Sequence, residues 1–283
     1  MNKMRKTKIV CTLGPSTDRE DVLRDMILSG MNVARFNFSH GTHEEHKRRL
    51  DTLKRLREEL NQPVAALLDT KGPEIRLKQF AGGKTELVTG QTFTLTTRDV
   101  EGTNEICSIT YKDLPGDLSV GSTVLLADGL ISLTVTKLTD TDITCKVENG
   151  GPISNNKGVN VPGVSLSMPY MSQRDKDDIL FGIEQGFDFI AASFTRSAQD
   201  IQEVRRLLNS HNSHIRIIAK IENREGVDNI DEILTAADAV MVARGDMAWR
   251  STSPRFPSSR KRLFITASPA ASRSSPPLRC WRA

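Results

Sequence analysis

Nearly continuous apolar runs alternate with polar stretches of helical spacing along most of this chain. The apolar runs are KIVCTLG near residue 10, NVARFNF near 35, VAALLDT near 67, FDFIAASF near 190, IRIIAKIE near 218 and AVMVARGD near 242. Strands that are apolar on both faces and alternate with helices are typical of a parallel sheet covered by helices. The pattern therefore predicts an α/β fold.

Capping signals between these runs support the predicted helices. Thr17 with Glu20, and Thr42 with Glu45, have the spacing of a capping box, in which two side chains satisfy the free amides of a helix start. Gly30 stands where a glycine would end the first of these helices.

One long segment departs from this alternation. Residues 73–163 contain short runs of alternating polarity, such as TFTLTT and DITCKVENGG, separated by glycine turns. They predict a small antiparallel β domain inserted after the third strand, with Pro73 and Pro162 at its hinges. The expected division is barrel residues 1–72 and 164–248, the insert 73–163, and a basic tail 249–283.

Charge is distributed unevenly along the chain. The whole chain carries +4, but residues 249–283 hold eight Arg or Lys and no Asp or Glu, which leaves 31 basic against 35 acidic residues before them. The tail shows no helical or strand period, so we expect it to be disordered. A nucleic-acid binder using this tail is a weak alternative, and we expect no nucleic-acid or membrane partner.

The four cysteines are far apart and form no CxxC pair. Neither a zinc ribbon nor a disulfide framework is indicated. The apolar run near the start of the chain is too short for the hydrophobic region of a signal peptide. We therefore expect a cytoplasmic protein.

Polar side chains close four of the predicted strands. The carboxyl ends of parallel strands meet at one edge of a sheet or barrel, where sites are built. Any one of these residues alone is better explained as a strand end that reaches solvent, but four strands with the same feature favour a site. The residues are Arg35, Asn37 and Ser39; Asp69 and Thr70; Lys220 and Glu222; and Asp246.

The spacing of three of these residues indicates a chemistry. Lys220 and Glu222 are two apart and point to one face of a strand, and Asp246 would arrive beside Glu222 from the next strand. Two carboxylates suit a hard cation such as Mg²⁺, and a nearby Lys suits phosphoryl transfer. A local ion pair is the plainer alternative. Because no glycine-rich phosphate loop is present, side chains and metal would hold the phosphates.

His40, His43 and His46 are three residues apart, as metal ligands on one face would be. Their order is not HExxH, and the last two fall in a charged helix start. We expect a solvated surface there rather than a metal site.

Six motifs in order carry a specific family resemblance: KTKIVCTLGP, NVARFNFSHG, LLDTKGPEIR, NNKGVNVPG, AKIEN and MVARGD. From about Lys6 to Met247 the chain resembles pyruvate kinase of the bacterial type. The resemblance implies a (β/α)8 TIM-type barrel with an inserted small antiparallel β-barrel lid domain. About 157 residues remain for the barrel once insert and tail are set aside, against ~250 in a typical one, so we expect it to be incomplete.

The resemblance also implies a role for each matching residue. Arg35 would bind the phosphate of phosphoenolpyruvate, Lys220 would stabilise the transferring phosphoryl group, and Gly245 and Asp246 would line the substrate pocket. The remaining implied ligands are Glu222 and Asp246 for Mg²⁺ (or Mn²⁺); Asn37, Ser39, Asp69 and Thr70 for K⁺; and Asn37, His40, Arg76 and Lys157 for the nucleotide.

The implied reaction transfers the phosphoryl group of phosphoenolpyruvate to ADP, giving ATP and pyruvate, with the insert closing over the nucleotide. An intact family member is expected to be a homotetramer. The alternative is an inactive fragment that keeps only Mg²⁺ and nucleotide binding.

The resemblance is expected to stop after Met247, where a Gly-Val-Glu continuation and the threonine of a seventh strand would follow. Reading a reverse translation of the tail one base out of register can restore that continuation. We hypothesise a single-base loss after the Met247 codon. An unclosed barrel would then expose the edges of its first and sixth strands, an aggregation hazard that predicts poor solubility.

Overall fold

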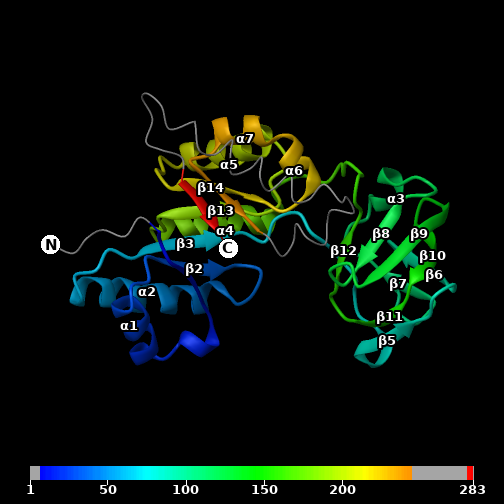
Figure 1. Cartoon of the computed structure of the whole chain (residues 1–283), viewed down its shortest axis with the longest axis horizontal. Coiled ribbons are helices and arrows are strands. Elements are labelled where there is room, and N and C mark those ends of the chain that lie inside the picture. The colour runs from blue at the N-terminus through cyan, green and yellow to red at the C-terminus, as the bar shows by residue number, and fades with distance from the viewer. Residues whose placement is uncertain (1–6, 244–278, 283) are drawn as a thin grey trace.

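The computed structural model describes residues 7–243 and 279–282. It contains a parallel sheet with flanking helices and a separate β-barrel unit, joined by two chain segments (Figure 1). In Figure 1 the parallel sheet and its helices lie on the left and the β-barrel unit lies on the right.

All six apolar runs of the sequence form neighbouring strands of the parallel sheet. Its order is β1-β2-β3-β13-β14-β15-β16, and each neighbouring pair is parallel. The predicted α/β fold is confirmed. The six strands are β1 (Val10–Leu13), β2 (Val33–Asn37), β3 (Ala65–Asp69), β13 (Phe189–Ala192), β14 (Arg216–Ile221) and β15 (Ala239–Val242).

Helices connect these strands in the alternation that the sequence predicted, and their buried side chains pack against one face of the curled sheet. None of the helices in residues 7–243 is long and apolar enough to cross a membrane. The helices are α1 (Glu20–Leu28), α2 (His43–Glu59), α4 (Gln173–Glu184), α5 (Ala198–Ser210), α6 (Arg224–Asp228) and α7 (Ile230–Ala236), with a 3-10 turn η1 (Pro15–Thr17).

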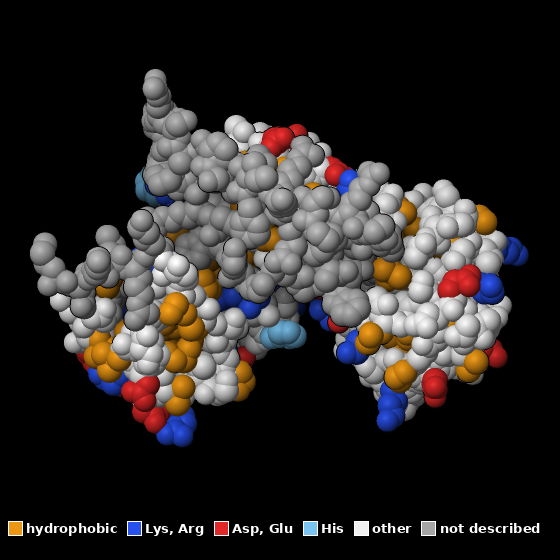
Figure 2. Space-filling view, in the orientation of Figure 1, with side chains coloured by type: hydrophobic (Ala, Val, Ile, Leu, Met, Phe, Trp, Pro, Cys, Tyr) orange, Lys and Arg blue, Asp and Glu red, His pale blue; other side chains and the backbone are white. Residues whose placement is uncertain are grey.

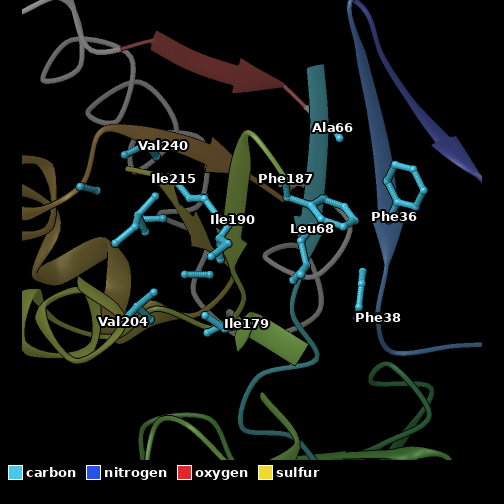
Figure 3. Close-up of a cluster of buried hydrophobic side chains, with 14 of the residues drawn as sticks. Phe36, Phe38, Ala66, Leu68, Ile179, Phe187, Ile190, Val204, Ile215 and Val240 are labelled. Atoms are coloured by element: carbon cyan, nitrogen blue, oxygen red, sulfur yellow. The ribbon is translucent and has the colours of Figure 1, made fainter. Parts of the chain in front are cut away.

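The two faces of the sheet bury different side chains. Along β2, Ala34 and Phe36 pack against the helices in the main core. Figure 3 shows part of this core, including Phe36, Leu68, Phe187 and Ile190. The intervening positions face the other way and form a second, smaller cluster, consisting of Val33, Leu67, Ala191, Ile218, Ala239 and Met241. Because side chains alternate along a strand, the inner face of the curled sheet holds this apolar layer.

The inserted segment forms a closed β-barrel unit. Its main sheet has the order β4-β12-β8-β9-β10-β6-β7, and an isolated bridge between Leu77 and Ile109 joins the two ends. All ladders of this sheet are antiparallel except β6 with β7. The strands are β4 (Ile75–Arg76), β6 (Thr92–Thr96), β7 (Ile106–Ser108), β8 (Thr123–Leu126), β9 (Ile131–Leu138), β10 (Asp142–Asn149) and β12 (Gly158–Asn160); β5 (Lys84–Leu87) pairs with β11 (Gly151–Ser154), and α3 (Leu114–Asp117) and η2 (Ala81–Gly83) lie between strands.

Two expectations about the tail need correction. The backbone of Arg279–Arg282 forms strand β16, which pairs in parallel with β15, although we expected the whole tail to be disordered. An open strand edge offers unpaired amides and carbonyls to any extended segment. Strand β16 pairs with this edge of β15, so the edge of the sixth strand is covered. The hypothesis of a base loss after Met247 lies outside the described residues.

The helix caps were predicted in part. Thr42 and Glu45 form the expected capping box of α2, and Gly30 follows the end of α1 with φ 103°. The Thr17 and Glu20 capping box was wrong. Thr17 instead bonds to Gly14, where its hydroxyl accepts from the amide at 2.9 Å, and α1 begins at Glu20 with Arg19 as its cap.

His46 corrects the expectation of a solvated histidine cluster. Its ring is buried, stacks on Phe38 at 4.1 Å between centroids, and donates from Nε2 to the carbonyl of His40 at 2.9 Å. His43 is half-exposed and contacts Asp178 at 2.6 Å. The turn of α2 that carries His46 faces the sheet, so this imidazole is a core side chain.

Burial of His46 predicts an acid-sensitive fold. Burial lowers the pKa of His46 below its usual 6.5, so the stability that the neutral ring contributes is present above pH 6.5 and is lost as pH falls through the folded-state pKa. We expect the free energy of unfolding to fall by up to about 1.4 kcal/mol per pH unit for this group below that pH. Urea unfolding at pH 7, 6 and 5 measures it.

The matched variants are His46→Gln, which keeps a donor for the His40 carbonyl but does not titrate, and His211→Gln at an exposed position. His46→Gln should flatten the pH dependence and His211→Gln should leave it unchanged. Equal slopes for His46→Gln and the unsubstituted chain would contradict the assignment.

Candidate active site

Arg35 and Asp69 begin a chain of charged groups at the carboxyl ends of the parallel strands. Arg35 near the end of β2 donates from Nε to Asp69 Oδ2 at 2.6 Å, and its Nη2 contacts the same oxygen. Its Nη1 donates to the Thr12 hydroxyl of β1 at 2.8 Å. The guanidinium is therefore oriented from two neighbouring strands while about a quarter of the side chain stays exposed (27%).

Lys220 continues the chain of charges. Its ammonium lies 2.9 Å from Asp69 Oδ1 and 3.1 Å from Glu222 Oε1, and all three side chains are buried. Burial acts to lower the pKa of Lys220, but the two adjacent carboxylates outweigh it and hold this pKa above its usual range. Lys220 is therefore a cation in a buried setting. The predicted pairing of Lys220 with Glu222 across one face of a strand is present.

Ser193 completes the surroundings of Lys220, and the sequence analysis missed it. Its hydroxyl accepts from Lys220 Nζ at 2.8 Å and lies 2.6 Å from the Thr70 carbonyl. The next residue, Phe194, has φ 56°, and its amide donates to Glu222 Oε2 at 2.8 Å. Ser193 follows β13 directly, so the strand-end rule applied to this fourth strand would have found it.

Strand alternation explains why these groups meet. Arg35, Asp69 and Lys220 continue the inner face that Val33, Leu67 and Ile218 occupy two residues earlier in their strands. The parallel register staggers them, since Arg35 is the partner of Leu67 whereas Asp69 is the partner of Asn37 and Ala191, and their side chains span this stagger to meet. The inner face thus changes from an apolar layer to a charged layer at the carboxyl edge.

The candidate K⁺ residues lie at this edge, with different orientations. Asn37 and Asp69 are register partners on β2 and β3, and Asn37 Oδ1 accepts from the Ser39 amide at 3.1 Å. The Thr70 hydroxyl instead points to β13, where it accepts from the Ser193 amide at 3.1 Å and donates to the Ala191 carbonyl at 3.3 Å. All four residues supply oxygen atoms of the kind that bind cations. Asn37 is linked to Ser39 by a hydrogen bond and to Asp69 by strand register.

The candidate nucleotide residues fall into two groups. Arg76 and Lys157 belong to the β-barrel unit, where the Leu77 amide donates to the Lys157 carbonyl at 2.8 Å. Arg76 pairs with Glu74 at 2.6 Å. Asn37 and His40 belong to the parallel sheet, and the His40 amide donates to the Asn37 carbonyl at 3.3 Å. The two groups come from different units.

Gly245 and Asp246 lie outside the described residues. Within residues 7–243, no group of three or more His, Cys, Asp and Glu side chains gathers closely enough to hold a metal ion. The structure therefore describes one of the two carboxylates expected for Mg²⁺, which is Glu222.

A hollow separates the two units in the space-filling view, and Lys or Arg and His side chains lie along it (Figure 2). Fold and site together define an α/β barrel-type protein with an inserted β-barrel and a charged layer at the carboxyl edge of its parallel strands.

Comparison with known proteins agrees with this class. The family model for the pyruvate kinase barrel domain matches residues 4–274. A pyruvate kinase of Sporosarcina psychrophila is 51% identical over 264 residues, and one of Geobacillus stearothermophilus is 52% identical over 263. Both alignments cover 92% of this chain and 45% of the relative, so the chain spans about half the length of these proteins.

A solved structure is similar as well. A crystal structure of a pyruvate kinase from Cryptosporidium parvum superposes with a TM-score of 0.87 at 39% identity, covering 93% of this chain and 55% of that one. The chain belongs to the pyruvate kinase family. The family match also runs beyond Met247, where the sequence analysis expected the resemblance to stop.

Coupling between Asp69 and Lys220 can be measured with Asp69→Asn, Lys220→Met and the double variant. Each single change removes one charged partner from a buried network, leaving Lys220 with Glu222 or Asp69 with Arg35, and we expect each to lower the free energy of unfolding by about 3 kcal/mol. The double variant should lose at least about 1 kcal/mol less than the sum. Urea unfolding gives the three values.

Lys47 and Asp51 on α2 provide a matched control, because they are 2.8 Å apart but half-exposed. The same substitutions there should couple by no more than about 0.5 kcal/mol. Additive losses at Asp69 and Lys220 would contradict the buried network.

Proposed function

We propose that this chain carries the phosphoryl-transfer site of a pyruvate kinase. The observation that best supports it is the buried Lys220 ammonium, held between Asp69 and Glu222 beside the partly exposed Arg35 guanidinium. A phosphoryl-transfer site needs fixed positive charge where the transition state gathers negative charge. In the proposed reaction the O–P bond of phosphoenolpyruvate breaks, a bond forms to an oxygen of ADP, and enolpyruvate takes a proton on carbon to give pyruvate.

Arg35 has the proposed role of binding the phosphate of phosphoenolpyruvate. Asp69 and Thr12 fix the plane of its guanidinium, so little side-chain entropy remains to be lost when an anion binds. A guanidinium carries five N–H donors, and the three contacts described here leave donors for phosphate oxygens.

Lys220 has the proposed role of stabilising the transferring group. An ammonium has three N–H donors, and Asp69, Ser193 and Glu222 offer three acceptors. A phosphoryl oxygen that binds Lys220 must therefore replace one of these contacts. The neutral Ser193 hydroxyl is the partner whose replacement costs least in electrostatic energy.

Metal ions fit the proposed site by the chemistry of its donors. Carboxylate oxygens suit Mg²⁺ or Mn²⁺, which Glu222 would hold together with Asp246, supplying positive charge at the phosphoryl oxygens. Oxygens of Asn37, Ser39, Asp69 and Thr70 would hold K⁺. Gly245 and Asp246 would also line the substrate pocket.

The nucleotide is proposed to bind between the two units, with Arg76 and Lys157 on one side and Asn37 and His40 on the other. The β-barrel unit would act as a lid that closes over the nucleotide and excludes water. Cys11, Cys107 and Cys145 are free thiols, which is compatible with the cytoplasm that we propose as its location.

Pyruvate formation from phosphoenolpyruvate and ADP, with Mg²⁺ and K⁺, tests this proposal on the purified chain. We expect turnover that Lys220→Met lowers by about a hundredfold or more, because fixed positive charge at the transition state is worth this much. Lys47→Met, an exposed position on α2, should keep full activity. A chain that is folded and binds Mg²⁺ and ADP but forms no pyruvate would contradict catalysis and select the alternative of a binding fragment.

A further inference from the structure

Two connections join the β-barrel unit to the parallel sheet. The first, between β3 and β4, is held tightly at Gly72, whose amide donates to Asp175 Oδ1 at 2.9 Å. Gly72 has φ 70°, and a Cβ there would lie 2.9 Å from the Ser193 carbonyl oxygen. This connection therefore has little room to change shape at that point.

The second connection, residues 161–172 between β12 and α4, is called the return linker here. Its Ser167 is bound to the β-barrel unit, since its amide donates to Asp117 Oδ2 at 3.1 Å and its hydroxyl lies 2.9 Å from Tyr111 Oη. Leu166 and Met168 pack against the core of that unit. The linker therefore moves with the β-barrel unit as far as Met168.

Arg196 holds the return linker from the opposite side. Its Nη1 donates to the carbonyls of Leu166 and Met168 at 3.3 and 3.2 Å, on either side of Ser167. The same guanidinium pairs through Nε and Nη2 with the buried Asp200 at 3.3 Å each. Arg196 is thus fixed to the start of α5 while it binds the backbone of the linker.

A cavity of about 340 Å³ lies beside this contact. Val161 and Val164 of the linker line one side, and Asn223 and Glu225 of the parallel unit are among the residues of its wall. The linker is therefore not packed against the parallel unit along that side, so the Arg196 contact bridges a gap.

The residues just before Arg196 contact the charged site. The Ser193 hydroxyl accepts from Lys220, the Phe194 amide donates to Glu222, and the Thr195 amide donates to the Lys220 carbonyl at 3.2 Å. One segment of four residues therefore contacts the charged layer at one end and the return linker at the other.

We propose that Arg196 is a positioning residue that sets where the β-barrel unit stands over the charged site. It acts through the return linker and does not touch the reacting groups. Only the expected effect of Arg196 on turnover rests on the proposed function. The contact between Arg196 and the return linker is tested independently of that function.

Hydrogen exchange followed by mass spectrometry on the full chain tests the contact in Arg196→Met and Arg196→Lys. Arg205→Met is the matched control, because Arg205 lies on α5, to whose start Arg196 is fixed, and pairs with Asp238. We expect exchange in the return linker to rise at least about tenfold in Arg196→Met, less in Arg196→Lys and not in Arg205→Met. Exchange in β9 and β14 should stay unchanged.

Steady-state kinetics give a second readout. The KM for ADP should rise about tenfold in Arg196→Met with a smaller change in kcat, and Arg196→Lys should recover part of it. Unchanged exchange in the linker of Arg196→Met would overturn the proposal. So would a uniform rise across linker, β9 and β14 in Arg196→Lys, since that indicates a merely structural role. A chain without turnover would count against the proposed function, and the exchange result would still decide the role of Arg196.

Discussion

A buried ammonium between two carboxylates is the constraint on which the parallel unit depends. Taking Lys220, Asp69 and Glu222 out of water is costly, and their attraction repays that only when the distances are short and the other polar atoms are bonded. Strands β3 and β14, with β13 between them, must therefore keep their mutual register, since a slip by one residue would turn these side chains to the opposite face. The helices and the apolar layer stabilise that register.

The same constraint prepares the site for an anion. Asp69 contacts both Arg35 and Lys220, so it holds two cations near each other that would otherwise repel. Their charge is oriented before any ligand arrives, which is the preorganisation that electrostatic catalysis requires. The contacts of the segment from Ser193 to Arg196 extend this arrangement from the charged layer to the connection with the β-barrel unit.

Much of this arrangement was predictable from the sequence. Apolar runs located the six strands, and the strand-end rule found Arg35, Asp69, Lys220 and Glu222, because period and parallel direction are local properties of the chain. Ser193 obeys the same rule but was missed, since a lone serine carries no charge to attract notice.

Other features depend on contacts that no local pattern encodes. His46 is buried because α2 turns that face to Phe38, and Arg196 meets the return linker across about thirty residues of sequence. Strand β16 pairs with β15 although its sequence has no strand period. Such tertiary contacts set the surroundings of a side chain, whereas its type and spacing are all that the sequence displays.

Calorimetric titration with phosphoenolpyruvate tests the central claim most directly, comparing the unsubstituted chain with Asp69→Asn in Mg²⁺ and a tetramethylammonium buffer. That buffer lacks K⁺, so loss of a monovalent-cation site cannot explain a difference. The account predicts weaker binding to Asp69→Asn, because Arg35 and Lys220 lose the carboxylate that orients them. Equal or tighter binding, as expected if removing a negative charge simply favours an anion, would contradict it.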